Sequence, residues 1–63
     1  MKKIACHYLV IERQRLPYSP CVVVFDTETK VVQRYYPFTE EESFTEWRGG
    51  ELTVEGGILL GEA

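Results

Sequence analysis

Hydrophobic residues in this chain gather in short runs separated by proline, glycine and acidic segments, a pattern typical of β-strands. The run Cys21–Phe25 is apolar at every position. Because successive strand residues point to opposite faces, both faces of this run need cover, which predicts a central strand. A polar interval at 26–30 separates it from a second run rich in valine and tyrosine, 31–36, and Pro37 then has no N–H to continue a ladder. These segments predict a β-hairpin around which the fold is organised.

The turn of this hairpin contains neither glycine nor asparagine. A loop of this length often needs a residue with positive φ near its end, so Thr29 or Lys30 is expected to adopt that conformation. The Asp26 side chain is expected to accept hydrogen bonds from the turn backbone.

The chain before the hairpin predicts one more strand and a loop. Residues 3–11 place apolar side chains on both faces and predict a first strand that is covered on both sides. Residues 12–20 are polar at their start and contain Pro17 and Pro20, so they predict a loop.

The chain after the hairpin predicts a helical turn and two strands. Thr39 to Glu42 fits the capping-box pattern of a helix start, and Phe44 and Trp47, three residues apart, would then face the sheet. Gly49-Gly50 ends this segment. Residues 51–55 alternate apolar and polar positions and predict a half-exposed strand that could lie at an edge. A tight turn at 56–57, a short last strand at 58–60 and a frayed end at 61–63 complete the pattern.

Together these elements predict an all-β fold, with five short strands and one helical turn in a single domain, residues 1–63. The architecture is expected to be a small partly open barrel or a flattened β-sandwich. A chain of 63 residues buries only about 60% of its unfolded surface, so the core is thin. Val23, Phe25, Val32 and Trp47 are expected to be largely buried.

Charge is unevenly distributed along the chain, whose net charge is −3. Residues 1–38 carry six lysines and arginines against three acidic residues, whereas residues 39–63 carry Arg48 against seven glutamates. An acidic total disfavours a nucleic-acid partner, because phosphate binding depends on lysine and arginine. No apolar run is long enough for a membrane helix, so we expect no membrane association and a cytoplasmic location.

No constellation for catalysis, metal or cofactor binding stands out. His7 is the only histidine, and Cys6 beside it would point to the opposite face of a strand. Cys6 and Cys21 are expected to be packed free thiols, and they could be neighbours if their strands pair. The glutamates at 40–42 lack the glycine turn and ligand spacing of a calcium loop. We therefore expect a protein that is not an enzyme and has no cofactor.

Aromatic residues form the richest cluster of candidate binding residues. They are most simply explained as core between a helix and the sheet, with an exposed recognition patch as the alternative. The candidates for such a patch are Tyr35, Tyr36, Phe38 and Trp47, together with Arg34 and Arg48.

The order of segments resembles a known family. Strands at 4–11, 22–25 and 31–35, Pro37, the segment 45–50 and the closing 57–61 are similar to the N-terminal small β-sandwich segment of amidohydrolase-superfamily enzymes. In that family the segment leads through leucine-proline-glycine to a His-x-His metal motif. Here Leu60 stands where proline would be expected, and the His-x-His pair and the catalytic barrel are absent. The resemblance therefore implies an accessory domain and carries over no functional residue.

These observations favour a non-enzymatic binding or assembly module with an unknown protein partner, which self-associates as a homo-oligomer. A dimer would use the first strand, 4–11, if that strand lies at an edge, or would appose the aromatic faces around Tyr36 and Trp47. The alternative is a small β-barrel that binds nucleic acid or a small ligand, with Tyr18 adding to the aromatic stacking surfaces.

Overall fold

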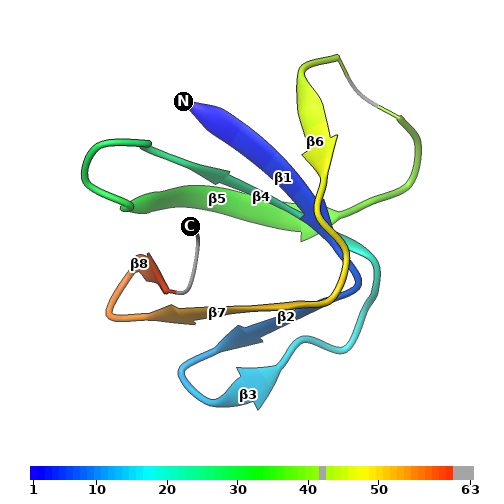
Figure 1. Ribbon diagram of the computed structural model, residues 1–63. Coiled ribbons are helices and arrows are strands. Elements are labelled where there is room, and N and C mark those ends of the chain that lie inside the picture. The colour runs from blue at the N-terminus through cyan, green and yellow to red at the C-terminus, as the bar shows by residue number, and fades with distance from the viewer. Residues whose placement is uncertain (42, 61–63) are drawn as a thin grey trace.

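A computed structural model describes residues 1–41 and 43–60 as eight strands in two four-stranded sheets (Figure 1). The strands are β1 (Lys2–Cys6), β2 (Tyr8–Ile11), β3 (Gln14–Arg15), β4 (Cys21–Phe25), β5 (Val32–Pro37), β6 (Thr45–Trp47), β7 (Glu51–Glu55) and β8 (Ile58–Leu60). The all-β prediction is confirmed. The sheets form a sandwich that is not closed into a barrel, and the part of the chain described contains no helix.

Each sheet combines antiparallel pairs with one parallel pair. Sheet A has the order β5-β4-β1-β6, in which β6 runs parallel to β1, and sheet B has the order β3-β2-β7-β8, in which β7 runs parallel to β2. The predicted hairpin is present as the antiparallel pair β4 and β5. At one corner the sheets also touch, because Val31 and Ile58 form an isolated bridge.

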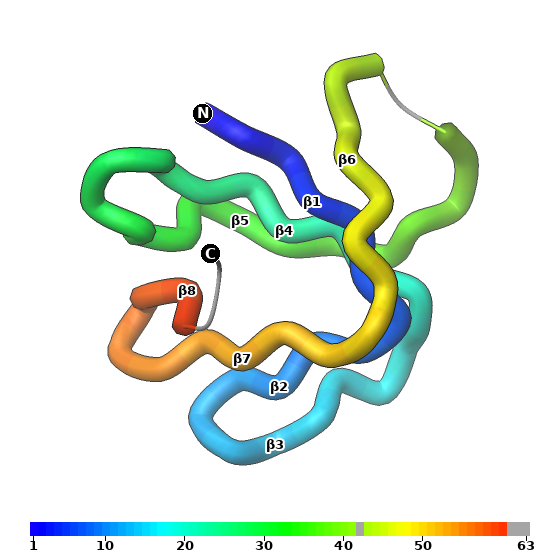
Figure 2. The backbone as a smooth tube through the Cα atoms, viewed as in Figure 1, coloured from blue at the N-terminus to red at the C-terminus, as the bar shows by residue number. Residues whose placement is uncertain are grey.

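The first hydrophobic run is two strands rather than one. A bend at His7 carries the chain from β1 in sheet A to β2 in sheet B, and residues 48–50 carry it from β6 to β7 in the same way. Figure 2 shows these two corners side by side. The backbone N–H groups of His7 and Tyr8 both donate to the Gly50 carbonyl at 3.0 Å, and the Gly50 N–H donates to His7 Nδ1 at 3.0 Å. These bonds tie the two corners together.

The main core lies between the two sheets. Its buried side chains are Ile4, Cys6, Cys21, Val23 and Phe25 from sheet A and Leu9, Leu52, Val54 and Leu59 from sheet B. All five residues of β4 are buried, which confirms that it is a central strand. Of the four residues expected to be largely buried, Val23 and Phe25 are fully so, and Val32 is partly buried against this core. Trp47 is not buried, as described below.

The turn of the hairpin forms as its sequence predicts. Asp26 Oδ1 accepts hydrogen bonds from the N–H groups of Glu28 at 2.8 Å and Thr29 at 3.1 Å. These bonds stabilise the ionised carboxyl and lower its pKa. Lys30 supplies the positive φ, at 66°.

The predicted helical turn is wrong. Thr45–Trp47 is strand β6, which pairs with β1, and Phe44 has a φ of 59° that no helix contains. A cap contributes only about 1 kcal/mol, and a local preference of that size is readily overridden by tertiary structure, here by the pairing of β6 with β1. Glu42, which completes the capping box, lies outside the described residues, as do 61–63.

The edge strands are not those considered from the sequence. β1 and β2 each have a partner on both sides, so the condition for dimerisation by strand addition to residues 4–11, that they lie at an edge, is not met. β7 is also an interior strand, between β2 and β8. The edges are β3, β6 and β8, of two or three residues each, and the six-residue β5. Very short edges are a common protection against strand addition.

The two thiols are neighbours, as the sequence allowed. Cys6 and Cys21 are register partners in β1 and β4, and both are buried and free. Burial raises the pKa of the Cys6 thiol to about 11, with a further contribution from Cys21, and burial also raises the pKa of Cys21. Because the thiolate is the reactive form, both side chains are chemically quiet in the folded protein.

We expect neither cysteine to react with a disulfide reagent such as dithionitrobenzoate at pH 8 in the folded protein. Both should react at once in concentrated guanidinium chloride, which serves as the control for reagent and protein concentration. Absorbance of the released thiolate gives the count. Rapid reaction of either thiol without denaturant would contradict this burial.

Candidate binding pocket on the outer face of sheet A

A second, smaller hydrophobic cluster lies on the outer face of sheet A, the face turned away from sheet B. Ala5, Val22 and Val24 are buried there beneath Tyr36 and Phe38. Strand alternation explains their position, because each of the three is adjacent in sequence to a residue of the main core. The two central strands of sheet A, β1 and β4, thus carry buried apolar side chains on both faces.

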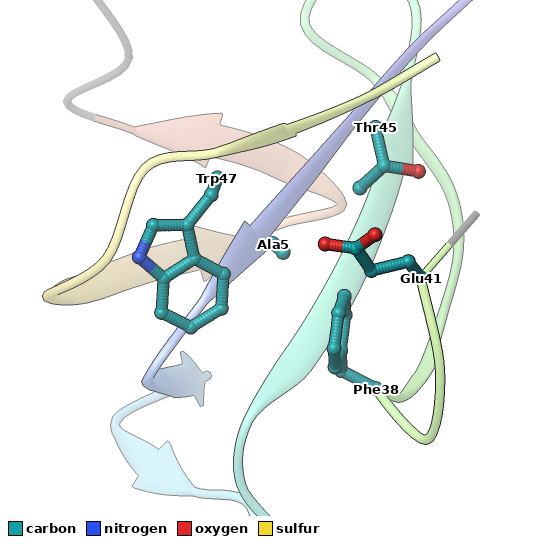
Figure 3. A pocket seen from close by; sticks show the side chains of 5 residues that line it. All are labelled: Ala5, Phe38, Glu41, Thr45 and Trp47. Atoms are coloured by element: carbon teal, nitrogen blue, oxygen red, sulfur yellow. The ribbon is translucent and has the colours of Figure 1, made fainter. Parts of the chain in front are cut away.

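A pocket of about 250 Å³ opens beside this cluster (Figure 3). Its described lining residues are Ala5, Phe38, Glu41, Thr45 and Trp47. Trp47 is the register partner of Ala5, so the indole stands beside a methyl group on β1. A larger side chain than alanine at that position would occupy the space that the pocket now provides.

The two aromatic side chains that line the pocket pack against each other at an angle. The ring centroids of Phe38 and Trp47 are 5.9 Å apart with an interplanar angle of 65°, and His7 packs on Trp47 at 5.0 Å and 81°. The Gly50 N–H fixes the His7 ring through Nδ1. Trp47 remains 52% exposed, which corrects the prediction that it is buried. The indole is therefore positioned by its neighbours yet open to solvent.

The polar groups of the pocket are a carboxylate and a hydroxyl. Figure 3 shows the Glu41 carboxylate turned inward, toward Ala5 and Trp47. Thr45 Oγ1 is buried and has no hydrogen-bond partner among the residues described. Buried polar atoms are nearly always paired, so an unpaired hydroxyl beside a pocket is unusual. The site combines aromatic and aliphatic walls with one anionic group.

The structure brings together only part of the predicted binding patch. Phe38 and Trp47 line the pocket, and Tyr36 packs on the same face. Arg34 is the register partner of Val24 and is exposed on this face, some distance along β5. Tyr35 pairs with Val23 and so lies on the opposite face of the sheet, where it is 42% exposed.

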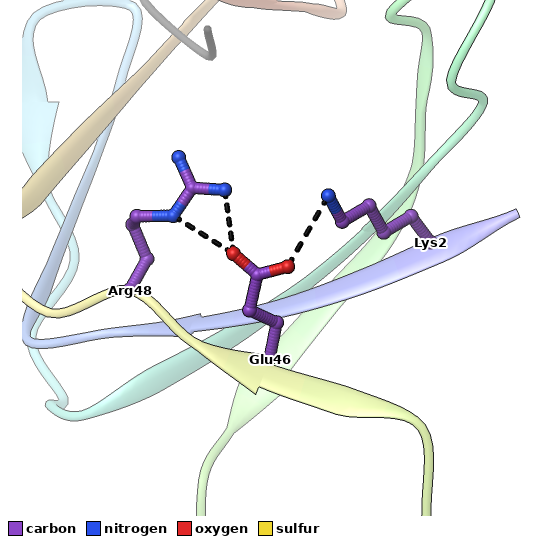
Figure 4. Close-up of polar contacts among 3 residues, drawn as sticks. All are labelled: Lys2, Glu46 and Arg48. Atoms are coloured by element: carbon purple, nitrogen blue, oxygen red, sulfur yellow. Dashed lines mark hydrogen bonds and ion pairs between the residues drawn. The ribbon is translucent and has the colours of Figure 1, made fainter.

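Two further candidates belong elsewhere. Tyr18 packs against the main core. Arg48 donates to Glu46 Oε2 from Nε at 3.1 Å and from a terminal nitrogen at 2.7 Å, and Lys2 Nζ lies 3.3 Å from Glu46 Oε1 (Figure 4). These cations, Arg48 first, lower the pKa of the Glu46 carboxyl. Because Glu46 alternates with Thr45 and Trp47, this exposed ion-pair group lies on the other side of β6 from the pocket.

Sequence reasoning missed three residues that line the pocket, and it also misplaced Phe44, which does not line it. Glu41 was part of a glutamate run typical of a solvated surface, and Ala5 and Thr45 carried no signal of their own. Phe44 was expected to face the sheet, but it is 95% exposed. Phe44 directly precedes the half-buried Thr45 of β6, and no pattern in the sequence alone indicates this exposure.

No group of three or more histidine, cysteine or acidic side chains gathers to hold a metal within residues 1–41 and 43–60. The same residues include no helix long and apolar enough to cross a membrane. No protein-family model, curated protein or solved structure matches the chain. The similarity to the amidohydrolase N-terminal segment therefore stays a prediction.

Proposed function

We propose that the protein is a non-enzymatic binding and assembly module that self-associates through the outer face of sheet A. The observation that carries this proposal is Trp47, which is half exposed at a pocket on a sheet face and is held in place by Phe38 and His7. Pre-positioned tryptophans in pockets are the residues that contribute most to protein interfaces. Two free, buried cysteines suit the cytoplasm, where thiols stay reduced.

Phe44 is a second exposed aromatic residue close to the pocket in sequence. It is 95% exposed, it has a φ of 59°, and it directly precedes Thr45 of the pocket. An aromatic residue with positive φ is strained, and such strain is concentrated at functional sites such as ligand clamps and switch regions. Phe44 and Trp47 are thus two aromatic side chains on one segment that a partner surface can bury.

The edges of the sheets support a face rather than a strand as the contact. Three of the four edge strands have two or three residues, which is too few for an extended ladder with a second chain, and the fourth, the six-residue β5, ends at Pro37, which has no N–H to donate. The outer face offers aromatic side chains instead. Of the two modes of dimerisation considered from the sequence, β1 as an interior strand leaves the contact between two such aromatic faces.

The alternative of nucleic-acid binding receives less support from the same residues. Arg48, which would have contacted phosphate, is engaged with Glu46, and the charged group at the pocket is the carboxylate of Glu41. A carboxylate repels the phosphate backbone on which such binding depends.

Sedimentation equilibrium tests the proposal. We expect the wild-type protein to form dimers at micromolar concentration and Trp47→Ala to weaken dimerisation at least about 30-fold, as expected for a hot-spot residue worth 2 kcal/mol or more. Tyr8→Ala is the matched control, since Tyr8 is a similarly exposed aromatic residue, 42% exposed, on sheet B. A wild-type protein that stays monomeric at high micromolar concentration would refute self-association. An equal effect of the two variants would refute this face as the interface.

A further inference from the structure

The charge of the pocket determines what it can accept. Among the described residues that line it, Glu41 is the one ionic side chain, and none is cationic. Its carboxylate is turned inward over apolar groups (Figure 3). Glu41 is an exposed residue, so its attraction for an opposite charge is modest and is weakened by salt.

The aromatic walls favour the same sign of charge. Ring faces carry negative potential and attract cations, with tryptophan the strongest of the three aromatic types. Phe38 and Trp47 are in edge-to-face contact, with centroids 5.9 Å apart and an interplanar angle of 65°, so a group in the pocket lies beside this aromatic pair and not between the rings. Aromatic side chains of this kind are used in proteins to recognise ammonium ligands.

The size of the pocket favours a side chain over a whole metabolite. Sites for complete small molecules usually span about 300–1,000 Å³, and this pocket has about 250 Å³. Its methyl floor at Ala5 and the edge of Phe38 suit an aliphatic stem, and Glu41 suits the charge at the tip. Lysine combines a flexible four-carbon stem with a compact ammonium group.

We infer that this pocket binds the alkylammonium group of a lysine side chain presented by a protein partner. The inference rests on the proposed binding role of the outer face and names the chemistry of the group that the face recognises. The segment after residue 38 is the acidic part of the chain, with seven glutamates against Arg48, which is itself paired with Glu46. Of these glutamates, Glu41 lies at the pocket, so the complementarity to a lysine side chain is local to the pocket.

Titration of ¹⁵N-labelled protein by NMR tests this inference, with the indole N–H of Trp47 as the reporter. The probes are short acetylated, amidated peptides of glycine with one central lysine, norleucine, arginine or glutamate. Norleucine is a close match to lysine without the ammonium group. We expect the lysine peptide to shift the Trp47 signal and to bind at least about tenfold more tightly than the norleucine peptide, with affinity falling as salt is added.

Two carboxylate variants sharpen the test. Glu41→Gln is expected to weaken the lysine peptide about tenfold and to leave the norleucine peptide unchanged. Glu40→Gln removes a charge from the neighbouring exposed residue, which does not line the pocket, and should change lysine binding less than about twofold. Trp47→Ala removes the reporter, so binding to this variant is followed by the backbone amide signals, which should show a persistent fold and no shift on addition of the lysine peptide.

The outcomes separate this inference from the proposed function. Equal binding of lysine and norleucine, tighter binding of arginine or glutamate, or equal effects of the Glu41 and Glu40 variants would overturn lysine recognition. If no peptide shifts Trp47 but dimerisation still depends on Trp47, the lysine inference fails and self-association stands. If lysine binds as expected to a protein that remains monomeric, self-association fails and the pocket chemistry stands.

Discussion

Phe25→Ala is expected to lower the free energy of unfolding by about 3–5 kcal/mol. Phe25 has no exposed surface and is the largest fully buried side chain of the core between the two sheets. At roughly 0.05–0.15 kcal/mol per residue, a chain of 63 residues has a total stability of about 3–9 kcal/mol. The substitution therefore removes a large share of the stability, because the cavity that it leaves is bounded by strands of both sheets. Guanidinium chloride unfolding followed by circular dichroism measures the loss.

Tyr35→Ala is the matched control for this prediction. It removes an aromatic ring from the other strand of the same hairpin, but Tyr35 is 42% exposed, so the loss should be clearly smaller. A cooperative Phe25→Ala variant with an unchanged unfolding midpoint would show that the β4–β5 hairpin does not organise the core.

The hairpin could be predicted because its signals are local. Five β-preferring residues in a row define β4, and their apolar character on both faces requires cover from two sides. Asp26 makes the expected turn bonds, and Lys30 takes the left-handed conformation that one of two residues had to adopt. None of these outcomes depends on a distant part of the chain.

The division of the first run into two strands could not be predicted in this way. Residues 4–11 contain no glycine or proline, and their alternation continues through His7. The bend there is fixed by Gly50, whose carbonyl accepts from both His7 and Tyr8. That partner lies 43 residues further along the chain, so no local pattern could indicate it.

The pocket also depends on strands that pair although they lie far apart in the sequence. Its floor and its indole wall come from Ala5 and Trp47, which meet only because β6 pairs in parallel with β1. The local signal at 39–42 favoured a helix, and a helix would have turned Phe44 and Trp47 onto the sheet. The aromatic cluster itself was evident from composition, but which of its members are exposed was decided by this pairing.

Gly50→Ala and Gly49→Ala are expected to lower the free energy of unfolding by about 1–2 kcal/mol each, and together by about 2–4 kcal/mol. Both glycines have positive φ, at 64° and 73°, at the corner where β6 leaves sheet A for β7 in sheet B. An L-residue is strained in that conformation, and this cost exceeds the gain that alanine brings by restricting the unfolded chain. Relaxing the strain would displace the Gly50 carbonyl from the His7 and Tyr8 N–H groups that hold the two corners together.

The Gly50→Ala substitution tests backbone conformation without the added effect of steric crowding. A Cβ at Gly50 would find nothing within 4 Å, whereas a Cβ at Gly49 would meet His7 and Trp47 at 3.6 Å, an ordinary contact. The loss in Gly50→Ala is therefore expected to come from the backbone alone. A chemically synthesised chain with D-alanine at position 50 is the control, because the mirror-image residue favours positive φ and should keep wild-type stability or gain about 0.4–1 kcal/mol. Equal losses for the two alanine enantiomers, or an unchanged unfolding midpoint with L-alanine, would contradict a corner that requires left-handed backbone.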